Sequence, residues 1–362
     1  MSVRYELLTT DGAARRGRVH TPRGSYETPV FMPVGTKGAI VHLDATDYER
    51  LGAEIVLGNT YHLMLKPGGD VIERFGGLHE FTTWGGHMLT DSGGFQVMSL
   101  NPKIDDDGVT FKSVYDGTTA RLTPESATKV QEQIGADIAM VLDICPSLPA
   151  TDRQIRQAME TTHRWAERAR AAHTRTDQAQ FGIVQGGVDP DLRVQSAAFL
   201  RELDFPGYGI GGLSVGESRE QMLPALEAAL SELPEDKPRY LMGVGDPISI
   251  VEAIALGVDQ FDCVLPTRLA RHGTILTSTG KINLRNSKFE GDMGVLDERN
   301  PFSNRFSRGY LRHLLKVKEP TGPRILTLHN LWYLLDLVDR TRTAIEQGTL
   351  SEIRAEVAEY WS

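Results

Sequence analysis

The sequence predicts an α/β fold, an irregular (β/α)₈ TIM barrel, and two observations support this prediction. Eight short apolar runs recur along the chain, and amphipathic stretches with helical spacing follow most of them. Near-continuous apolar strands that alternate with helices indicate a parallel sheet covered on both faces. Eight such units predict a closed barrel, with an open doubly wound sheet as the alternative.

The chain begins with a mixed segment, residues 1–30, whose turn signals at Asp11-Gly12 and Pro22-Arg23-Gly24 predict a short hairpin or cover. The eight strands are expected at 30–34, 54–57, 87–90, 138–142, 180–184, 208–213, 240–244 and 261–265. The clearest helices between them are expected at 152–173, 189–203, 217–233 and 247–256.

Two insertions interrupt this alternation. Residues 103–122 and 274–285 predict β-hairpins, with turns at Asp116-Gly117 and Thr279-Gly280. The C-terminal helices are expected at 307–317, 323–347 and 351–361. We therefore expect one catalytic barrel domain over 1–362, with a C-terminal subdomain at 286–347.

The composition fits a soluble globular protein. Of the 362 residues, 40% are hydrophobic and 24% are charged, and no run of about 18 apolar residues predicts a membrane span. The start, MSVRYELLTTDGAARRG, lacks the apolar region of a signal peptide. Cys145 and Cys263 lie far apart, which argues against a disulfide scaffold and predicts a cytoplasmic protein.

The charge is unevenly distributed. A net charge of −9 argues against a protein that coats nucleic acid indiscriminately, but residues 264–324 carry 12 Lys or Arg against 5 Asp or Glu. A basic segment on an acidic body indicates one localised polyanion site. A solvated basic face is the alternative.

One stretch, residues 259–273, combines an acid with several bases. Asp262 lies near the end of a short apolar run that Pro266 is expected to stop, and a loop with Arg268, Arg271 and His272 is expected to follow. An acid beside a basic loop suits attack on a negatively charged substrate. A capping aspartate before solvated arginines is the alternative.

Other polar groups occur where the predicted strands end, notably Asp91, Asp143 and Gln185, together with the Gly211-Gly212 pair. In a (β/α)₈ barrel these positions share one face, so the side chains should converge. Each also has a structural explanation: a capping turn for Asp91, a buried ion pair for Asp143, a plain hydrogen bond for Gln185, and close packing for the glycines.

Paired carboxylates indicate chemistry at an anomeric carbon. One acid attacks or stabilises an oxocarbenium-like centre, and the other moves protons. Spacing and composition alone favour a sugar-active barrel enzyme and do not name the substrate.

Seven motifs in order resemble those of one family. They are MLTDSGGFQVMSL, VLDICPS, FGIVQGG, YGIGGLSVGE, YLMGVGDP, FDCVLPTRLARHG and NLRNSKF. Together they resemble the tRNA-guanine transglycosylases (queuine tRNA-ribosyltransferases), from TPVFMPVGT to TLHN. The resemblance implies an irregular (β/α)₈ barrel and a transferase that exchanges the wobble guanine of tRNAs with GUN anticodons, a step of queuosine biosynthesis.

The resemblance also assigns roles to residues of this chain. It implies that Asp262 is the nucleophile and Asp91 the proton acceptor. Substrate binding is expected at Ser92, Gly93, Gly94, Phe95, Asp143, Cys145, Gln185, Gly211, Gly212, Leu213, Val215 and Met242. Contacts to tRNA are expected at Gly243, Val244, Gly245, Asp246, Pro247, Thr267, Arg268, Leu269, Ala270 and Arg271.

Two residues resemble the bacterial branch of the family. Cys145 and Val215 imply a narrow pocket for 7-aminomethyl-7-deazaguanine (preQ1), whereas eukaryotic members have smaller residues there and take queuine. Ile144 departs from the bacterial pattern, which usually has Glu at this position. The resemblance is compatible with a homodimer.

A second departure concerns a metal site. The family carries Cys-x-Cys-x-x-Cys and a histidine as zinc ligands, but the matching positions here are Glu298, Asn300, Ser303 and His329. Without a thiolate, the family zinc is predicted absent, no cofactor is expected, and His329 should be an ordinary helix residue. Apolar packing is expected to hold this region, with the apolar side chains of Pro301, Phe302, Phe306 and Tyr310.

Two further alternatives remain within the resemblance. A non-catalytic tRNA-binding relative is disfavoured because Asp91, Asp143 and Asp262 are all present. A homologue that inserts 7-deazaguanine into DNA is disfavoured because the PTRLAR segment is intact.

Overall fold

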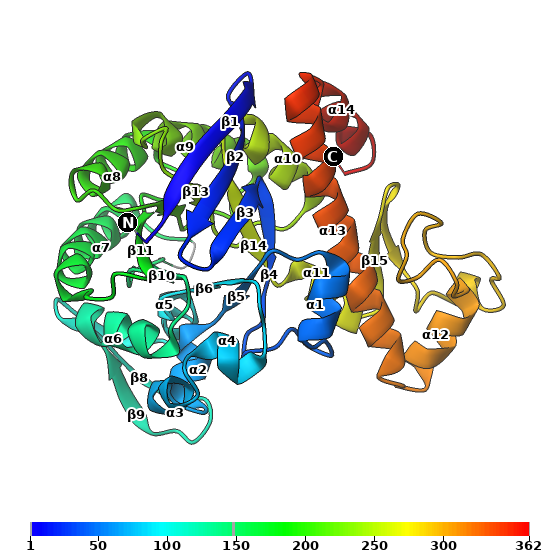
Figure 1. Cartoon of the computed structure of the whole chain (residues 1–362), viewed down its shortest axis with the longest axis horizontal. Coiled ribbons are helices and arrows are strands. Elements are labelled where there is room, and N and C mark those ends of the chain that lie inside the picture. The colour runs from blue at the N-terminus through cyan, green and yellow to red at the C-terminus, as the bar shows by residue number, and fades with distance from the viewer. Residues whose placement is uncertain (1, 147–148, 362) are drawn as a thin grey trace.

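An eight-stranded parallel sheet lies at the centre of the computed structural model, which describes residues 2–146 and 149–361 (Figure 1). Ser147 of the VLDICPS motif lies outside these ranges. The strands neighbour one another in chain order and match the eight predicted runs. They are β4 (Val30–Pro33), β5 (Ile55–Gly58), β6 (His87–Thr90), β10 (Ile138–Met140), β11 (Ala179–Val184), β12 (Tyr208–Ile210), β13 (Arg239–Leu241) and β14 (Gln260–Cys263).

The sheet closes on itself. The last strand, β14, pairs in parallel with the first, β4, and aligns Phe261 with Phe31. A parallel bridge joins Val34 to Leu57, and Gly35 N–H donates to the Leu57 carbonyl at 2.7 Å, which connects β4 to β5. The predicted barrel is therefore confirmed, and the open doubly wound sheet is wrong.

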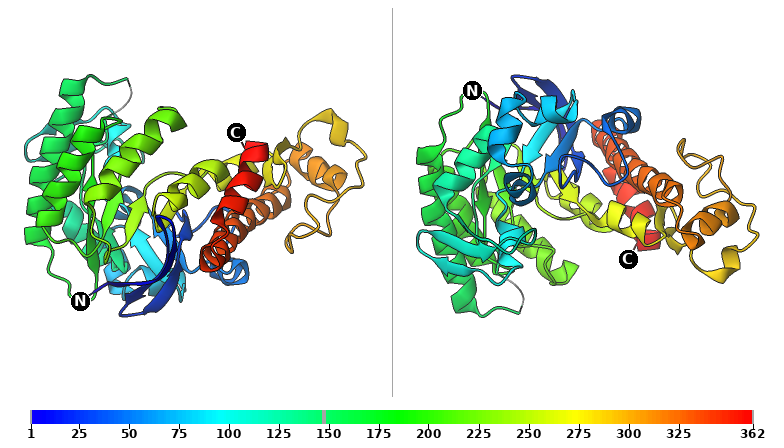
Figure 2. Two further views of the ribbon diagram at one scale, coloured as in Figure 1. Left: turned by 90° about the horizontal axis from the view of Figure 1, so that it is seen from above. Right: turned by 90° about the horizontal axis from the view of Figure 1, so that it is seen from below.

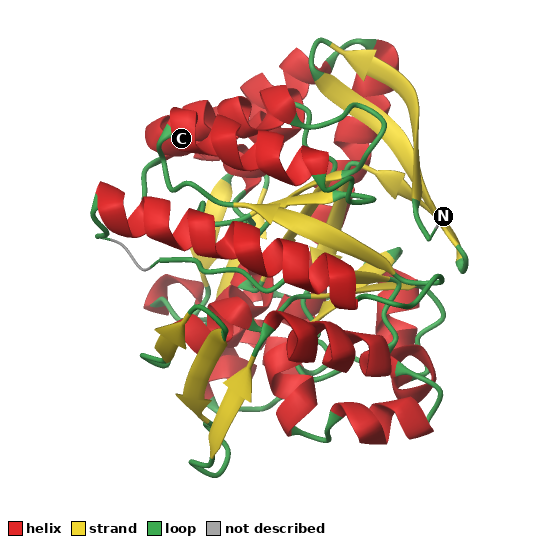
Figure 3. Cartoon of the chain, turned by 90° about the vertical axis from the view of Figure 1, so that its left-hand side faces the viewer, coloured by secondary structure: helices red, strands yellow, loops and turns green. Residues whose placement is uncertain are grey.

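Helices surround the barrel strands (Figure 3). They are α1 (Ala45–Leu51), α2 (Thr60–Leu65), α3 (Gly69–Arg74), α4 (Leu78–Thr82), α5 (Gly94–Met98), α6 (Pro124–Ile134), α7 (Asp152–Ala172), α8 (Pro190–Glu202), α9 (Arg219–Glu232) and α10 (Pro247–Ala255). Local sequence explains where several of them begin. Asp189 and Asp246 cap α8 and α10, and proline occupies the next position, where its fixed φ suits a helix start.

One local prediction was wrong. The segment after β14 was expected to be a loop because Pro266 should stop the strand, but it forms the helix α11 (Leu265–Arg271). Proline is tolerated in the first turn of a helix, since its missing N–H would have no intrahelical partner there. Pro266 ends the strand and begins the helix.

Three small antiparallel sheets lie outside the barrel sheet in the described part of the chain. The N-terminal cover has three strands, β1 (Arg4–Asp11), β2 (Ala14–Thr21) and β3 (Gly24–Thr28). The first insertion has three strands rather than two, β7 (Lys103–Asp105), β8 (Gly108–Lys112) and β9 (Thr119–Leu122). The second is the predicted hairpin of β15 (Thr274–Thr277) and β16 (Gly280–Asn283), with its turn at residues 278–279, one position earlier than expected.

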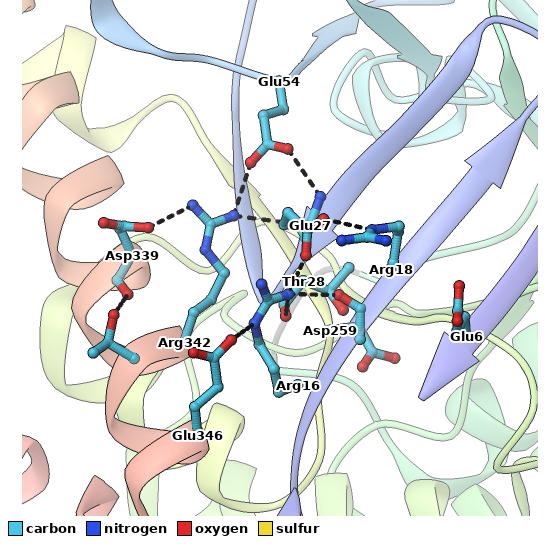
Figure 4. Close-up of polar contacts among 12 residues, drawn as sticks. Glu6, Arg16, Arg18, Glu27, Thr28, Glu54, Asp259, Asp339, Arg342 and Glu346 are labelled. Atoms are coloured by element: carbon cyan, nitrogen blue, oxygen red, sulfur yellow. Dashed lines mark hydrogen bonds and ion pairs between the residues drawn. The ribbon is translucent and has the colours of Figure 1, made fainter. Parts of the chain in front are cut away.

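The amino-terminal end of the barrel is closed by ion pairs between distant segments (Figure 4). Arg342 of α13 (Thr321–Gln347) donates to Glu54 at 2.8 Å and to Asp339 at 2.9 Å. The buried Asp259 carboxylate lies 3.2 Å from the Arg15 guanidinium of β2. A cavity of about 260 Å³ is lined by Glu54, Asp339 and Arg342 together with mostly apolar side chains, so we interpret this end as structural.

The C-terminal region extends beyond the barrel as α12 (Arg308–Lys316), α13 and α14 (Leu350–Trp361). In Figure 2, α12 and its neighbouring loops lie at one end of the molecule, away from α6–α9. A separate apolar cluster that includes Phe289, Leu311 and Leu326 fills this end. Among the described residues, no helix is long and apolar enough to cross a membrane.

Candidate active site

The carboxyl ends of the barrel strands surround a cavity of about 370 Å³. Asp91, Asp143 and Asp262 line it together, as the barrel rule predicted. The other predicted site residues that line it are Ser92, Phe95, Cys145, Gly211, Gly212, Leu213, Val215, Met242, Gly243, Gly245, Asp246 and Arg268. Gln185, Gly93 and Gly94 lie immediately behind this wall, where they contact Asp143 or Asp91.

Asp262 presents one carboxylate oxygen for chemistry. Its Oδ1 accepts hydrogen bonds from Tyr240 Oη at 2.6 Å and from Gly243 N–H at 2.8 Å. Its Oδ2 has no hydrogen-bond partner among the described residues. Burial raises the pKa of Asp262 to about 6, with a smaller contribution from the Asp91 charge, although Tyr240 and Gly243 act in the opposite direction.

Asp91, by contrast, is fully engaged. Its Oδ1 accepts from the backbone N–H groups of Thr60 at 2.8 Å and Gly93 at 3.1 Å. Its Oδ2 accepts from the side-chain amides of Asn59 and of Gln96, the latter at 3.0 Å. Burial raises the pKa of Asp91 even though all four donors favour the charged form.

Asp143 links three strands. Its Oδ2 accepts from Gln185 Nε2 of the β11 end at 2.7 Å, and its Oδ1 accepts from Ser92 Oγ after β6 at 3.4 Å. Burial raises the pKa of Asp143 to about 6, and the charge of Asp91 adds to this effect. The alternative of a buried ion pair is wrong for the described residues, since both partners are neutral.

Glycines let the backbone approach these polar groups closely. Gly212 has φ +67, and a Cβ there would lie 2.3 Å from Gln185 Oε1. A Cβ at Gly94 would lie 2.9 Å from the Asp143 carbonyl oxygen. A larger residue would displace Gln185 at position 212 or the Asp143 backbone at position 94, so close packing accounts for both glycines.

The residues expected to contact tRNA differ in how they could reach a ligand. Gly243, Gly245, Asp246 and Arg268 line the cavity, and Arg271 is exposed on α11; Leu269, half-buried, packs against the core. The side chains of the remaining four are buried, so only their backbones could reach a ligand: Val244, Pro247, Thr267 and Ala270. Asp246 also caps α10 through Ser249 N–H at 3.0 Å.

Sequence reasoning placed Asn59 at a strand end without giving it a role, and it missed two further partners of the aspartates, Gln96 and Tyr240. A signal existed for Tyr240, which precedes Met242 by two residues and therefore points to the same side of β13. Asn59 follows the strand predicted at 54–57, as Asp91 follows the strand predicted at 87–90. Gln96 lies on the short helix α5 and carries no comparable signal.

The residues that match the family zinc ligands form a neutral hydrogen-bonded cluster. Asn300, Ser303 and His329 are fully buried. His329 Nε2 lies 2.8 Å from the Leu276 carbonyl and must donate to it, so Nδ1 accepts from Ser303 Oγ at 2.8 Å and Asn300 Nδ2 at 3.1 Å. Burial lowers the pKa of His329 to about 4, which keeps the ring uncharged.

This arrangement does not fit a zinc site. Glu298 is exposed, and the described residues hold no group of three or more His, Cys, Asp or Glu that could ligate a metal. The expectation that His329 is an ordinary helix residue is wrong, because both ring nitrogens bind other segments. The prediction of apolar packing is correct for two of the four side chains. Phe302 and Phe306 join apolar clusters, whereas Pro301 and Tyr310 are exposed.

Comparisons with known proteins agree with this geometry. The sequence model of the family described as queuine tRNA-ribosyltransferase matches residues 10–362. A queuine tRNA-ribosyltransferase of Herpetosiphon aurantiacus is 53% identical over 95% of this chain and 88% of the relative. Those of Symbiobacterium thermophilum and Marinobacter nauticus are each 51% identical, over 100% and 97% of this chain and 92% and 95% of their own lengths.

The buried charge of Asp143 should cost stability. Because its pKa is raised to about 6 when folded, the folded state binds more protons than the unfolded state between about pH 4 and 6, and stability falls as pH rises through that window. Asp143→Asn should therefore raise the thermal midpoint at pH 8, with a smaller difference at pH 4. The exposed Asp236→Asn is the control; an unchanged or lower midpoint for Asp143→Asn at pH 8 contradicts the assigned burial cost.

Proposed function

The chain belongs to the queuine tRNA-ribosyltransferase family, and from this premise we propose how its residues exchange the base of a tRNA nucleoside. The family establishes a tRNA-guanine transglycosylase of queuosine synthesis. We propose the wobble guanosine of tRNAs with GUN anticodons as the substrate. The observation that carries the mechanism is the cavity in which Asp91 and Asp143 lie together with Asp262, whose Oδ2 is free.

In the first step, Asp262 Oδ2 attacks C1′ of the ribose. The C1′–Oδ2 bond forms as the bond from C1′ to guanine N9 breaks, and N9 of the leaving guanine takes a proton from protonated Asp91, which regains one in the second step. Tyr240 and Gly243 hold Oδ1, which fixes the orientation of the carboxylate without occupying the attacking oxygen. With a pKa of about 6, Asp262 is ionised at neutral pH and still basic enough to be a good nucleophile.

In the second step, the incoming base loses its N9 proton and attacks C1′, which releases Asp262. Asp91 is the proton acceptor. Four donors occupy its oxygens, so accepting a proton requires Asn59 or Gln96 to turn away. Burial raises the pKa of Asp91, which increases its proton affinity.

Asp143, Gln185 and Gly212 recognise the purine. A carboxylate pairs with the N–H groups of the guanine edge, while amide and backbone N–H groups donate to its carbonyl oxygen. Phe95, 62% exposed at the cavity, and the half-buried Met242 provide apolar contacts for the ring. Arg268 and Arg271 contact the anticodon phosphates or bases.

Two coarser expectations accompany this function. A cytoplasmic location suits a protein with a tRNA substrate and two free cysteines. A homodimer remains a prediction from the family resemblance.

A guanine-exchange assay tests the activity. Radiolabelled guanine should enter tRNA, and a covalent tRNA adduct should be trapped with the wild-type protein and lost in Asp262→Ala, because this variant lacks the carboxylate oxygen proposed to attack C1′. Asp236→Ala, far from the cavity lining, is the control. Exchange into duplex DNA instead would favour the DNA-inserting alternative, and no exchange would favour a tRNA-binding relative.

The preferred incoming base is preQ1. Ile144 does not line the cavity: it is buried in an apolar cluster with Trp165, so its departure from the bacterial pattern leaves the pocket wall unchanged. Glu217 accepts from the N–H groups of Ser214 and Val215. In the trans peptide between Leu213 and Ser214, the carbonyl points opposite to the N–H, so the Leu213 carbonyl points away from Glu217. Leu213 lines the cavity, where this carbonyl can accept a hydrogen bond from an aminomethyl group.

Competition measures this preference. PreQ1 should inhibit labelled-guanine exchange at least about tenfold more strongly than queuine, a difference in binding free energy of about 1.4 kcal/mol. The reason is that Val215 and Cys145 narrow the pocket. Val215→Gly should reduce the ratio by giving queuine room. Equal competition by both bases in the wild-type protein would refute the assignment.

We further propose that the protein needs no zinc. The buried cluster of Asn300, Ser303 and His329 satisfies its own polar groups and contains no thiolate. Its hydrogen bonds join the 300–303 loop to α13, the two segments that the family ligands would join through a metal, and also join α13 to β15.

Metal analysis tests this proposal. The purified protein should contain far less than one equivalent of zinc, and a chelator should leave its activity and thermal midpoint unchanged. The triple variant E298C/N300C/S303C, which places three cysteines near His329, should acquire one equivalent. A full equivalent in the wild-type protein would show that the segment has been matched incorrectly to the family site.

A further inference from the structure

The Arg193 side chain is fully buried next to the cavity wall, and it forms no ion pair within the described part of the chain. Its guanidinium donates instead to three backbone carbonyls. Nε donates to Gly187 at 2.7 Å, and Nη1 donates to Val184 at 3.0 Å and Gly211 at 2.7 Å. A buried charge without a carboxylate is costly. Burial accordingly lowers the pKa of Arg193 to about 10, and the group still remains charged at neutral pH.

The three carbonyls belong to two neighbouring strand ends. Val184 ends β11, Gly187 lies in the loop after it, and Gly211 follows β12. Gly211 N–H also donates to the Val184 carbonyl at 3.0 Å. The guanidinium therefore adds a second connection between the backbones that carry Gln185 and Gly212.

Peptide geometry extends this contact into the cavity. The Gly211 carbonyl points at Arg193, so the trans peptide directs Gly212 N–H the opposite way. Burial raises the pKa of the Cys145 thiol to about 12, and a hydrogen bond from the Gly212 N–H opposes this rise. The Gly212 N–H therefore lies beside the Cys145 thiol. Gly212 and Cys145 both line the cavity, so Arg193 sets the direction of a backbone donor there.

A second residue of α8 holds Gln185. Ser196, three residues after Arg193 and thus on the same helix face, accepts from Gln185 N–H through Oγ at 3.1 Å. His163 Nε2 lies 2.9 Å from the same oxygen, and burial keeps His163 neutral by lowering its pKa to about 4. The Gln185 side chain in turn donates to Asp143.

We propose that Arg193, assisted by Ser196, is a positioning residue for base recognition, which fixes the Gly212 donor and the Gln185 backbone against the purine. The proposal rests on the proposed function, because it requires the base to bind in this cavity. Lysine cannot replace the arginine fully, since Nε and Nη1 reach three separate carbonyls from one rigid plane, whereas an ammonium is a single point of donation.

Steady-state kinetics separates this role from simple packing. Arg193→Met should raise KM for guanine about tenfold or more, equivalent to about 1.4 kcal/mol, and leave KM for tRNA within about twofold. Arg193→Lys should fall between Met and wild type, and Ser196→Ala should raise KM for guanine by less than Arg193→Met. Arg201→Met is the control: Arg201 lies on the same helix but donates to Glu232 at the surface, so its variant should match wild type.

The outcomes distinguish a positioning role of Arg193 from a purely structural one. Lower thermal midpoints with an unchanged KM for guanine would overturn the positioning role and leave a structural one. An equal rise of both KM values would also overturn it. If Arg193→Met does not fold, Arg193→Lys and Ser196→Ala are tested by the same comparison of KM for guanine with KM for tRNA. A wild-type protein that exchanges no guanine refutes the proposed function and this inference together, whereas exchange with an unmoved KM refutes this inference alone.

Discussion

Asp91, Asp143 and Asp262 share one cavity, and in the described structure none of these three forms an ion pair; this constraint organises the rest of the site. Without a paired cation, each charge depends on neutral donors: backbone N–H groups, amides and hydroxyls supplied by neighbouring strand ends. Those donors are aligned only because the barrel closes and brings the strand ends together. The closed sheet is therefore a requirement of the chemistry as well as a scaffold for it.

The number of donors differentiates the aspartates. Asp262 has two donors on one oxygen, Asp91 has four, and Asp143 has two that come from different strands. The same kind of side chain thus presents a free oxygen in one place and a saturated carboxylate in another. Environment, rather than residue type, divides the roles that we propose for them.

The sequence predicted the barrel because buried parallel strands appear as apolar runs, and it predicted the convergence of the aspartates because Asp91 and Asp143 follow such runs and Asp262 lies near the end of one. It could not predict every partner of these aspartates. Gln96, on a short helix, and Arg193, on the amphipathic helix α8, show their roles only when carbonyl and carboxylate positions are known. The prediction of a loop at α11 was wrong for another reason: the same covalent geometry lets proline end a strand and begin a helix. At the C-terminal end, missing cysteines were visible in the sequence, but the hydrogen-bonded cluster around His329 was not.

The far end of the barrel joins the first and last parts of the chain. Arg16 of β2 donates to Glu346 of α13, Asp11 accepts from Leu350 N–H, and Arg342 bonds Glu54 beside the first barrel strands. During synthesis the N-terminal sheet leaves the ribosome long before α13 does. The amino-terminal end of the newly made barrel consequently stays open until α13 has emerged, so its closure is a late event of biogenesis.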